Sequence, residues 1–416
     1  MMNSIRLPAL PPVPERRLAV RLTPDALRQV RGGHPWVYAE AITSAPDGAE
    51  SSEPGALAVI FDSKRNFAAI GLWDPTSPIR IRILHVGKPR SIDDDFWRDA
   101  ITSAASKRGS LAQSGTTGYR WIHGENDGLG GLIVDRYSDT LVLKVYSTAW
   151  LPHLESIVRA LVEVGEPDRI ILRFGRRAQA DQSVQAAGLT DGMVILGDAP
   201  LAPIEFLENG LRFGADVVEG QKTGHFLDQR DNRRFIGEVS KGANVLDVFC
   251  CTGGFSVYAA SGGARAVHSV DISAPAIANT LENFARNPET STTAHQTTTG
   301  DAFKVLADLA LKGSQYDIVV IDPPSFASKA SEHGGAIRAY RKLAELGLEV
   351  LKPGGRLLQA SCSSRVSEDE LVSVVAGAVT ATGRERTEQR VFGHAVDHPV
   401  GFAQGRYLKA ITAIID

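Results

Sequence analysis

Apolar residues in the second half of the chain occur in short blocks that alternate with helical patterns. Continuous apolar runs predict buried strands at 245–249, 266–270, 316–321 and 356–360. Amphipathic segments between them predict helices at about 274–285, 304–311 and 337–351. Strands that alternate with helices favour an α/β fold with a doubly wound parallel sheet, in which ligands lie at the carboxyl ends of the strands. We expect this domain to cover residues 204–416.

The first half of the chain has a different pattern. Short strand-like segments separated by turns predict a small, β-rich, barrel-like domain over residues 1–90. A helix at about 92–107, with Ser91 as its N-cap, then opens a compact α+β domain over residues 91–203. In the last domain, the polar stretch that follows the 274–285 helix is predicted to be a loop leading to Gly300.

Composition narrows the classes of protein. The length of 416 residues suits about three domains, and no apolar run approaches the length of a membrane span. No signal peptide is apparent, and three cysteines cannot form a disulfide framework or a usual zinc site, so we expect no metal and a cytoplasmic protein. The net charge of −3 argues against indiscriminate nucleic-acid binding. Residues 1–90 nevertheless hold 12 Lys and Arg against 8 Asp and Glu, which suits either phosphate contact or an ordinary solvated surface.

The stretch 244–255 indicates a nucleotide site. A buried strand is followed by a turn containing Gly253 and Gly254, then a helix, then a second strand that ends in Asp271. This order is typical of nucleotide-binding α/β units, whose acid can accept hydrogen bonds from ribose hydroxyls. The dinucleotide fingerprint is absent, and Asp247 inside the first strand resembles the first motif of class I S-adenosylmethionine (SAM) methyltransferases. The alternative is a glycine-bearing turn that binds nothing.

Several residues around this unit are candidate SAM ligands. Asp301 is placed to accept from the adenine amino group, although it also suits a helix N-cap. A polar cluster at 222–230 suits a lid over SAM or over the target base, or a set of capping and ionic contacts. The full set of expected cofactor-binding residues is Phe249, Thr252, Gly253, Gly254, Phe255, Asp271, Ile272, Asp301, Ala302, Phe303, Asp322, Lys222, Phe226 and Asp228.

Two further segments carry candidate chemistry. Asp322-Pro-Pro-Ser-Phe326 follows a strand and resembles the fourth motif of nucleic-acid base methyltransferases; its prolines fix the backbone, and Phe326 could stack on a base. Cys362 follows a later strand, whose tip a parallel sheet brings beside Asp322. A thiolate that adds to carbon-6 of a pyrimidine activates carbon-5 for methylation, so Cys362 is our candidate nucleophile and Asp322 its catalytic partner. The alternative for Cys362 is a small buried side chain, which is how we interpret Cys250 and Cys251.

These motifs together resemble the bacterial 23S rRNA (cytosine-C5) methyltransferase I family over nearly the whole chain. The stretches that carry the resemblance are 31–38, 124–137, 221–233, 252–255, 322–326, 361–363, 397–400 and 405–409. The resemblance implies an N-terminal PUA RNA-binding domain, a central domain, a catalytic SAM-binding domain, 23S rRNA as substrate and a possible homodimer. Cys362 matches the family's nucleophile. Cys251, Ser325 and a shortened 397–400 stretch depart from the family pattern, which leaves the RNA target open.

Two other functions stay open on the sequence. Asp-Pro-Pro enzymes that methylate a base nitrogen, such as that of guanine, need no thiol, and a vestigial fold would leave a non-catalytic RNA-binding protein. The base that removes the carbon-5 proton is also undetermined, with Asp397 and Asp322 as weak candidates. In every catalytic case the target base must be unstacked to reach a pocket.

Overall fold

The protein is described by a computed structural model covering residues 4–327 and 329–416. Its internal contacts divide the chain into two compact units. The first consists of Met1–Leu207 with Ala215–His225, and the second of Glu208–Gly214 with Phe226–Asp416. The proposed domain boundaries at residues 90 and 203 stay a prediction, because this division does not address domains inside the first unit.

The first unit contains two sheets. The six-stranded sheet has the order β2 (Trp36–Tyr38), β6 (Ile79–Val86), β5 (Phe67–Trp73), β4 (Leu57–Phe61), β1 (Leu18–Leu22) and β3 (Ile42–Ser44). The five-stranded sheet has the order β11 (Met193–Leu196), β10 (Arg169–Phe174), β9 (Thr140–Val145), β8 (Leu132–Tyr137) and β7 (Gly118–His123). The expected β-rich start of the chain is thus present.

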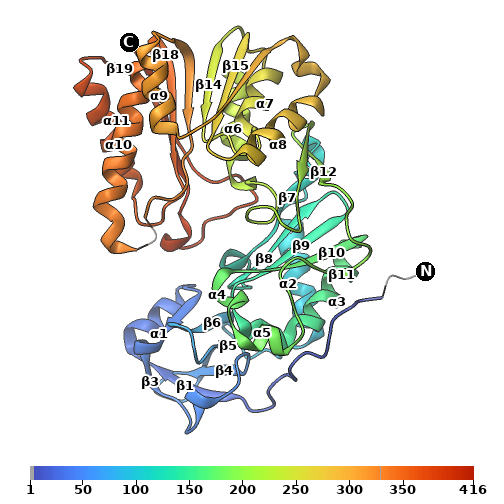
Figure 1. The fold of residues 1–416 in the computed structure, drawn as a ribbon. Helices are drawn as coiled ribbons and strands as arrows, with labels where there is room; N and C mark the ends of the chain where they lie inside the picture. The colour runs from blue at the N-terminus through green and yellow to red at the C-terminus, as the bar shows by residue number, and fades with distance from the viewer. Residues whose placement is uncertain (1–3, 328) are drawn as a thin grey trace. The chain divides into compact units, whose positions relative to one another are not determined.

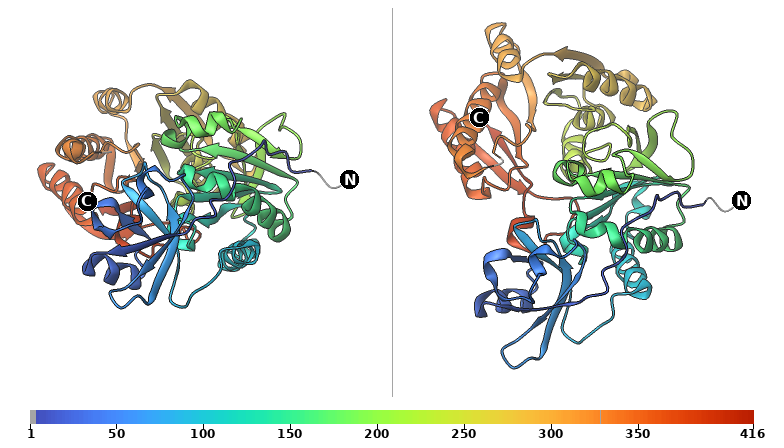
Figure 2. Two further views of the ribbon diagram at one scale, coloured as in Figure 1. Left: turned by 90° about the horizontal axis from the view of Figure 1, so that it is seen from below. Right: turned by 60° about the horizontal axis from the view of Figure 1, so that its bottom comes forward.

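Helices of the first unit cover its sheets. They are α1 (Pro24–Arg31), α2 (Asp94–Ser106), α3 (Leu154–Gly165), α4 (Arg176–Gln179) and α5 (Gln182–Ala186). Buried side chains of α2 and α3 share one core with the five-stranded sheet, and the two helices lie side by side (Figures 1 and 2). The predicted N-cap Ser91 is wrong, because the Asp93 carboxylate accepts from the Phe96 N–H at 3.0 Å and starts the helix there.

The second unit is built on a seven-stranded sheet. Its order is β16 (Ala294–Thr299), β15 (Ala266–Asp271), β14 (Asn244–Val248), β17 (Tyr316–Ile321), β18 (Leu351–Ser361), β20 (Lys409–Ile415) and β19 (Arg386–Phe392). The first five strands are parallel, whereas β20 and β19 are antiparallel. The α/β class is confirmed, and the strands that the sequence predicted are parallel; β20 and β19, which it did not predict, add an antiparallel edge. The hairpin β12 (Ile204–Glu208) and β13 (Leu211–Ala215) precedes this sheet in the sequence.

Helices cover both faces of this sheet, as a doubly wound fold requires (Figure 1). One face carries α6 (Arg230–Val239), α7 (Gly254–Ser261) and α8 (Ala274–Ala285), and the other α9 (Ala302–Leu311), α10 (His333–Glu349) and α11 (Glu368–Ala381). Each face has its own core of buried apolar side chains. Across the described residues, none of the helices combines the length and apolarity needed to cross a membrane.

One element that the sequence does not reveal is β16. The prediction of a loop over Ala294–Thr299 is wrong, because this stretch pairs in parallel with β15 from Ala266 to Asp271. Apart from Ala294 its side chains are polar, and none of its residues is buried, because it is an edge strand. β-branched threonines favour strands even without an apolar pattern, and a prediction based on the pattern of apolar residues does not detect this preference.

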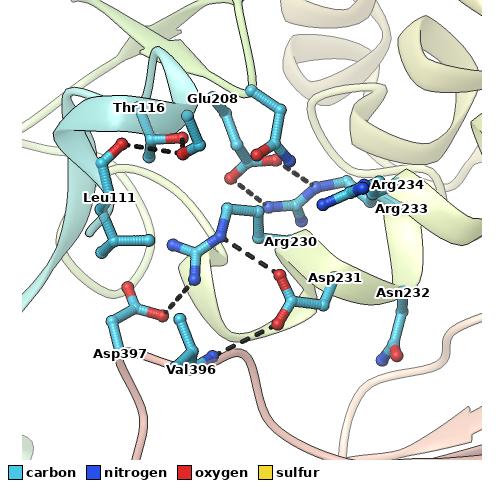
Figure 3. Close-up of polar contacts among 12 residues, drawn as sticks. Leu111, Thr116, Glu208, Arg230, Asp231, Asn232, Arg233, Arg234, Val396 and Asp397 are labelled. Carbon is cyan, nitrogen blue, oxygen red and sulfur yellow. Dashed lines mark hydrogen bonds and ion pairs between the residues drawn. The ribbon is translucent and has the colours of Figure 1, made fainter. Parts of the chain in front are cut away.

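Two arginines of α6 are buried and paired with carboxylates in the second unit (Figure 3). Arg233 forms a bidentate pair with Glu208, with Nε–Oε1 at 2.8 Å and Nη2–Oε2 at 2.6 Å. Arg230 pairs through Nη2 with Asp397 Oδ1 at 2.8 Å. A buried ion pair is strongly destabilised when one partner is removed, because the other charge is left without compensation.

We therefore expect Arg233→Met to destabilise the second unit by about 3–5 kcal/mol. The change leaves the Glu208 carboxylate, which has no exposed surface, without its cation. Urea unfolding of the variant measures the loss. Arg234→Met is the matched control, since the Arg234 side chain is 64% exposed and pairs with the surface residue Glu238; it should change stability by about 0.5 kcal/mol or less. Equal stability of the two variants would contradict the expectation.

Candidate active site

The turn after β14 is sharply bent. Phe249, Cys251 and Gly253 all have positive φ, at 65°, 51° and 76°. Two of them are not glycine, and non-glycine residues in this region are uncommon and concentrate at functional sites. At Gly253 a Cβ atom would also come within 2.5 Å of the Thr280 side chain on α8. Only glycine therefore fits there, and the backbone is held in a tight loop at the carboxyl end of the strand.

The rest of the glycine turn is fixed by the start of α7 and by α8. The Thr252 carbonyl accepts from the Asn283 amide at 2.8 Å. Gly254 is the first residue of α7, and the Phe255 side chain is buried in the core of that face. The Phe255 ring is therefore occupied by core packing, and the contact of Phe255 with a cofactor stays a prediction.

Asp271 ends β15 and faces the turn. Its Oδ2 accepts from the Cys251 N–H at 2.9 Å, and its Oδ1 accepts from the Ser273 N–H at the same distance. The next side chain, Ile272, is 70% exposed, which is unusual for a large apolar residue. A carboxylate held by two backbone donors thus lies beside an exposed apolar surface.

Asp301 and its neighbours follow β16. Asp301 is the N-cap of α9, and its Oδ1 accepts from the Lys304 N–H at 3.1 Å. Ala302 is buried, and Phe303 is partly buried against the apolar core. The capping interpretation of Asp301 is therefore confirmed, and its role toward adenine stays a prediction.

Asp247 is a buried carboxyl group inside β14. Its Oδ2 accepts from the Ser256 N–H at 3.0 Å and from the Ser256 hydroxyl at 2.6 Å. The Oδ1 atom is buried and has no partner among the residues that the structure describes. Burial raises the pKa of Asp247 to about 7, with a further contribution from the charge of Asp271.

Asp322 follows β17, the strand that pairs with β14. Its N–H donates to the Val248 carbonyl at 3.3 Å, which ties it to the end of the neighbouring strand. Burial raises the pKa of Asp322 to about 7, and the charges of Asp228 and Asp247 add to the increase. A hydrogen bond with the Gln229 side chain acts in the opposite direction. Near neutral pH this carboxyl group can therefore either hold or release a proton.

Cys362 follows β18, which is the direct neighbour of β17. Cys362 is partly exposed. The pKa of the Tyr340 phenol is raised to about 12, chiefly by burial, and the charges of Cys362 and Asp322 contribute to the increase. The charges of both candidate catalytic groups therefore act on the same phenol. The Tyr340 hydroxyl also accepts from Ser361, the residue before the cysteine, at 2.9 Å.

The other two cysteines lie in the glycine turn. Burial raises the pKa of Cys251 to about 12 and also raises that of Cys250, so both thiols stay protonated at neutral pH. Neither is suited to act as a nucleophile, which agrees with their interpretation as packing residues.

The predicted lid at 222–230 divides between the two units. Lys222 and Thr223 belong to the first unit, where Lys144 donates to the Lys222 carbonyl at 2.7 Å and the Thr223 hydroxyl bonds to Asp135. These contacts suit the alternative of structural capping and ionic contacts.

The remaining lid residues belong to the second unit. Asp228 accepts from the Tyr407 hydroxyl at 3.0 Å, and the Phe226 carbonyl accepts from Arg233 at 2.8 Å. Arg230 binds Asp397, and this ion pair together with His398 holds the pKa of Asp397 far below its usual range (Figure 3). Asp397 is therefore unsuited to be the base that removes a carbon proton.

Comparison with known proteins identifies the family. The model of the S-adenosylmethionine-dependent methyltransferases matches residues 174–402, and that of a PUA-like domain matches residues 20–85. A ribosomal RNA large subunit methyltransferase of Deinococcus radiodurans is 44% identical over 405 residues, which cover 96% of this chain and 98% of that protein. The chain belongs to the SAM-dependent ribosomal RNA large subunit methyltransferases. The ribosomal RNA large subunit methyltransferase I of Shewanella denitrificans is 34% identical over 95% of this chain and 99% of its own.

Solved structures agree with the fold of this methyltransferase. A Streptococcus mutans protein assigned to the SAM-dependent methyltransferases superposes with a TM-score of 0.79, covering 95% of this chain and 99% of its own at 21% identity. A second solved structure, of a protein assigned as a methyltransferase and complexed with SAH, gives a TM-score of 0.78 over 96% of this chain and 99% of its own at the same identity. At this identity the likeness concerns the fold alone.

SAM is the cofactor of this methyltransferase, and the residues present suit it. The tight turn at Gly253 brings backbone close to a ligand, and the oriented Asp271 carboxylate can accept from hydroxyl groups. The exposed Ile272 side chain offers an apolar face for a base, and the unpartnered Asp247 Oδ1 leaves one buried acceptor to satisfy. Within the described residues, no group of three or more His, Cys, Asp or Glu could hold a metal ion.

Four residues near these side chains were missed from the sequence. Gln229 and Tyr407 bond to Asp322 and Asp228, and Tyr340 and Lys409 lie close to Cys362. Lys409 and Tyr407 fall in the 405–409 stretch that carries the family resemblance. The sequence therefore indicated that this stretch matters, but it did not indicate a role for either residue. Tyr340 lies in the middle of α10 and has no sequence signal.

The raised pKa of Asp247 makes stability depend on pH. The folded state keeps this proton up to about pH 7, whereas the unfolded chain releases it near pH 4, so unfolding free energy falls as pH rises between the two. Asp247→Asn should make this slope shallower by about 1.4 kcal/mol per pH unit. Denaturant unfolding at several pH values between about 4.5 and 8 measures the slope. An unchanged slope would show that Asp247 titrates normally in the fold.

Proposed function

We propose that this methyltransferase transfers the SAM methyl group to carbon-5 of a cytosine in 23S rRNA, through a covalent adduct with Cys362. The observation that carries the proposal is the position of Cys362 and Asp322 directly after the paired strands β18 and β17. The strand next to β17 is β14, whose turn contains Gly253. The names of the relatives, which are rRNA large subunit methyltransferases, support RNA as the substrate.

The chemistry assigns separate roles to the two side chains. The Cys362 thiolate forms a bond to carbon-6 and displaces the electrons of the carbon-5–carbon-6 double bond toward N3. Asp322 in its acid form donates a proton to N3, which accepts these electrons and becomes N–H, and Asp322 is left as a carboxylate. Carbon-5 then has enamine character and becomes nucleophilic. Bound SAM supplies the electrophilic methyl group. Loss of the carbon-5 proton and departure of the Cys362 sulfur restore the ring double bond and the free thiolate, and N3 returns its proton to the Asp322 carboxylate.

The residues that we propose to bind the cofactor also come after the carboxyl ends of the parallel strands. In this proposal Asp271 holds the ribose hydroxyls, Ile272 and Phe303 flank the adenine, and Asp301 meets its amino group. Residues Phe249 and 252–255 surround the methionine portion of SAM with their backbone. Phe326, which packs edge-to-face on Tyr340 at 5.1 Å, lies close to the Asp322 turn and suits stacking on an unstacked base.

Other parts of the proposal rest on the family resemblance. These are 23S as the target molecule, a homodimer, a cytoplasmic location, and domains that divide near residues 90 and 203. A PUA-like domain and the excess of basic residues in 1–90 support contact with RNA phosphates. Sedimentation of the purified protein tests the dimer.

A mechanism-based trap tests the nucleophile. With RNA that contains 5-fluorocytosine and with SAM, the wild type should form a protein–RNA complex that survives denaturing electrophoresis, because fluorine cannot leave as a proton does. Cys362→Ala should abolish both the complex and 5-methylcytosine in mapped rRNA. Cys250→Ala, which alters a buried packing thiol, should keep both. Carbon-5 methylation by the Cys362→Ala variant excludes this mechanism, and methylation of a purine nitrogen without trapping would favour the guanine alternative.

The role of Asp322 predicts a pH dependence. Its acid form is required and its pKa is raised to about 7, so single-turnover methylation should decline above neutral pH. An asparagine can donate an N–H bond but cannot supply a proton, so Asp322→Asn should lower the rate by about 100-fold or more. Its remaining activity should lack the decline above pH 7. SAM binding by calorimetry serves as the control for an intact cofactor site, and a wild-type pH profile in Asp322→Asn would argue against the acid role.

A further inference from the structure

Lys409 occupies an unusual position in the second unit. It is the first residue of β20, and in the antiparallel pairing with β18 it lies directly opposite Ser361. The β20 strand therefore begins at the edge where the parallel strands end. Although Lys409 is a lysine, the residue is only 3% exposed. A buried lysine at this place needs a partner, since burial of a charge without compensation is costly.

The contacts of Lys409 converge on the loop that carries Cys362. Its Nζ atom donates to the Ser363 carbonyl, one residue after the cysteine. No carboxylate lies within ion-pair distance of Nζ in the described parts of the chain. Burial lowers the pKa of Lys409 to about 8, so it still carries a charge at neutral pH, and the largest opposing influence on this pKa is the charge of Cys362.

Other charged and titratable groups also face the Cys362 loop. The charges of Cys362 and of Asp322, which follows β17, both act on Tyr340 of α10, and the charges of Glu370 and Glu368 of α11 act on Lys409. A negative Asp322 or an ionised Tyr340 would disfavour a thiolate, and neither can stabilise one by charge. Lys409 is thus the one cation that the described residues bring to this loop by direct hydrogen bonding.

We propose that Lys409 is a positioning residue that stabilises the Cys362 thiolate through its ammonium charge and fixes the 361–363 loop through its bond to Ser363. The proposal rests on the function proposed above, in which that thiolate adds to carbon-6. When the thiol loses its proton to solvent, the buried ammonium gains the anionic partner that the fold does not otherwise give it. The lysine makes no contact with substrate in this role.

The ionisation of Cys362 can be measured without substrate. Wild-type protein is treated with iodoacetamide at pH values from about 5.5 to 10, and alkylation of the Cys362 peptide is followed by mass spectrometry, which separates it from Cys250 and Cys251. The wild-type midpoint should lie below the ordinary thiol value of about 8.5. In Lys409→Met the midpoint should rise, so that alkylation at pH 7 becomes about tenfold slower, one pKa unit being a factor of ten.

Matched variants separate charge from packing. Lys409→Arg keeps the charge and should stay close to the wild type, whereas Lys409→Gln should behave like Lys409→Met. Lys312→Met, at the exposed end of α9 where the chain approaches the amino end of β17, should leave the profile unchanged. Far-UV circular dichroism checks the fold of each variant. If the methionine and glutamine variants do not fold, the wild-type midpoint alone decides: a value at or above about 8.5 overturns the proposal.

Two outcomes distinguish this proposal from the function it rests on. Unchanged alkylation in folded Lys409→Met and Lys409→Gln overturns the role of Lys409, even if Cys362→Ala is inactive and trapping succeeds. Continued carbon-5 methylation by Cys362→Ala overturns the covalent mechanism, whatever the alkylation profile shows. A raised midpoint in Lys409→Met, with trapping that slows at pH 7 and recovers at higher pH, supports the proposal.

Discussion

The parallel pairing of β14, β17 and β18 is the constraint on which the rest of the second unit depends. Its register aligns Val248 with Ile321 and Ile321 with Gln359, so the three chains leave the sheet within one or two residues of each other. The bent turn, Asp322 and Cys362 come directly after these three strands, in that order. A shift of one strand by a single residue would turn its side chains to the opposite face and separate these groups. Hydrogen bonds between backbones thus set the geometry of the chemistry.

Buried carboxyl groups of the second unit have two kinds of surroundings. Around α6, Glu208 and Asp397 each form an ion pair with a buried arginine, and the pKa of Asp397 falls far below its usual range. At the edge, Asp247 and Asp322 have no cation within ion-pair distance in the described chain, and their pKa values rise to about 7. The first arrangement fixes a charge permanently. The second leaves protons exchangeable near neutral pH, which is a property expected of functional groups and not of supporting ones.

The sequence predicts the parts that depend on local pattern. The sequence places Asp271, Asp322 and the glycine turn at the carboxyl ends of strands. A run of apolar residues indicates each strand, and the first polar residue after the run indicates where the strand ends. The sequence does not predict β16, whose threonines have no apolar pattern, or the antiparallel β20. Contacts between distant segments are also hidden: Gln229 meets Asp322, and Tyr340 meets Ser361, across a spacing that no motif encodes. The contiguity of residues 222–230 predicts a single lid cluster, yet the fold divides them.

The antiparallel direction of β20 has a consequence that a parallel strand could not provide. Parallel strands reach the edge of the proposed active site with their last residues, so side chains there come from the loops that follow. An antiparallel strand begins at that edge, and Lys409 is therefore held by the ladder itself, opposite Ser361. A lysine on a loop would reach solvent and lose much of its effect on a nearby thiol to screening. Placed at the start of a central strand, its chain is confined by packing and its charge acts in a poorly solvated setting, where electrostatic interactions are stronger.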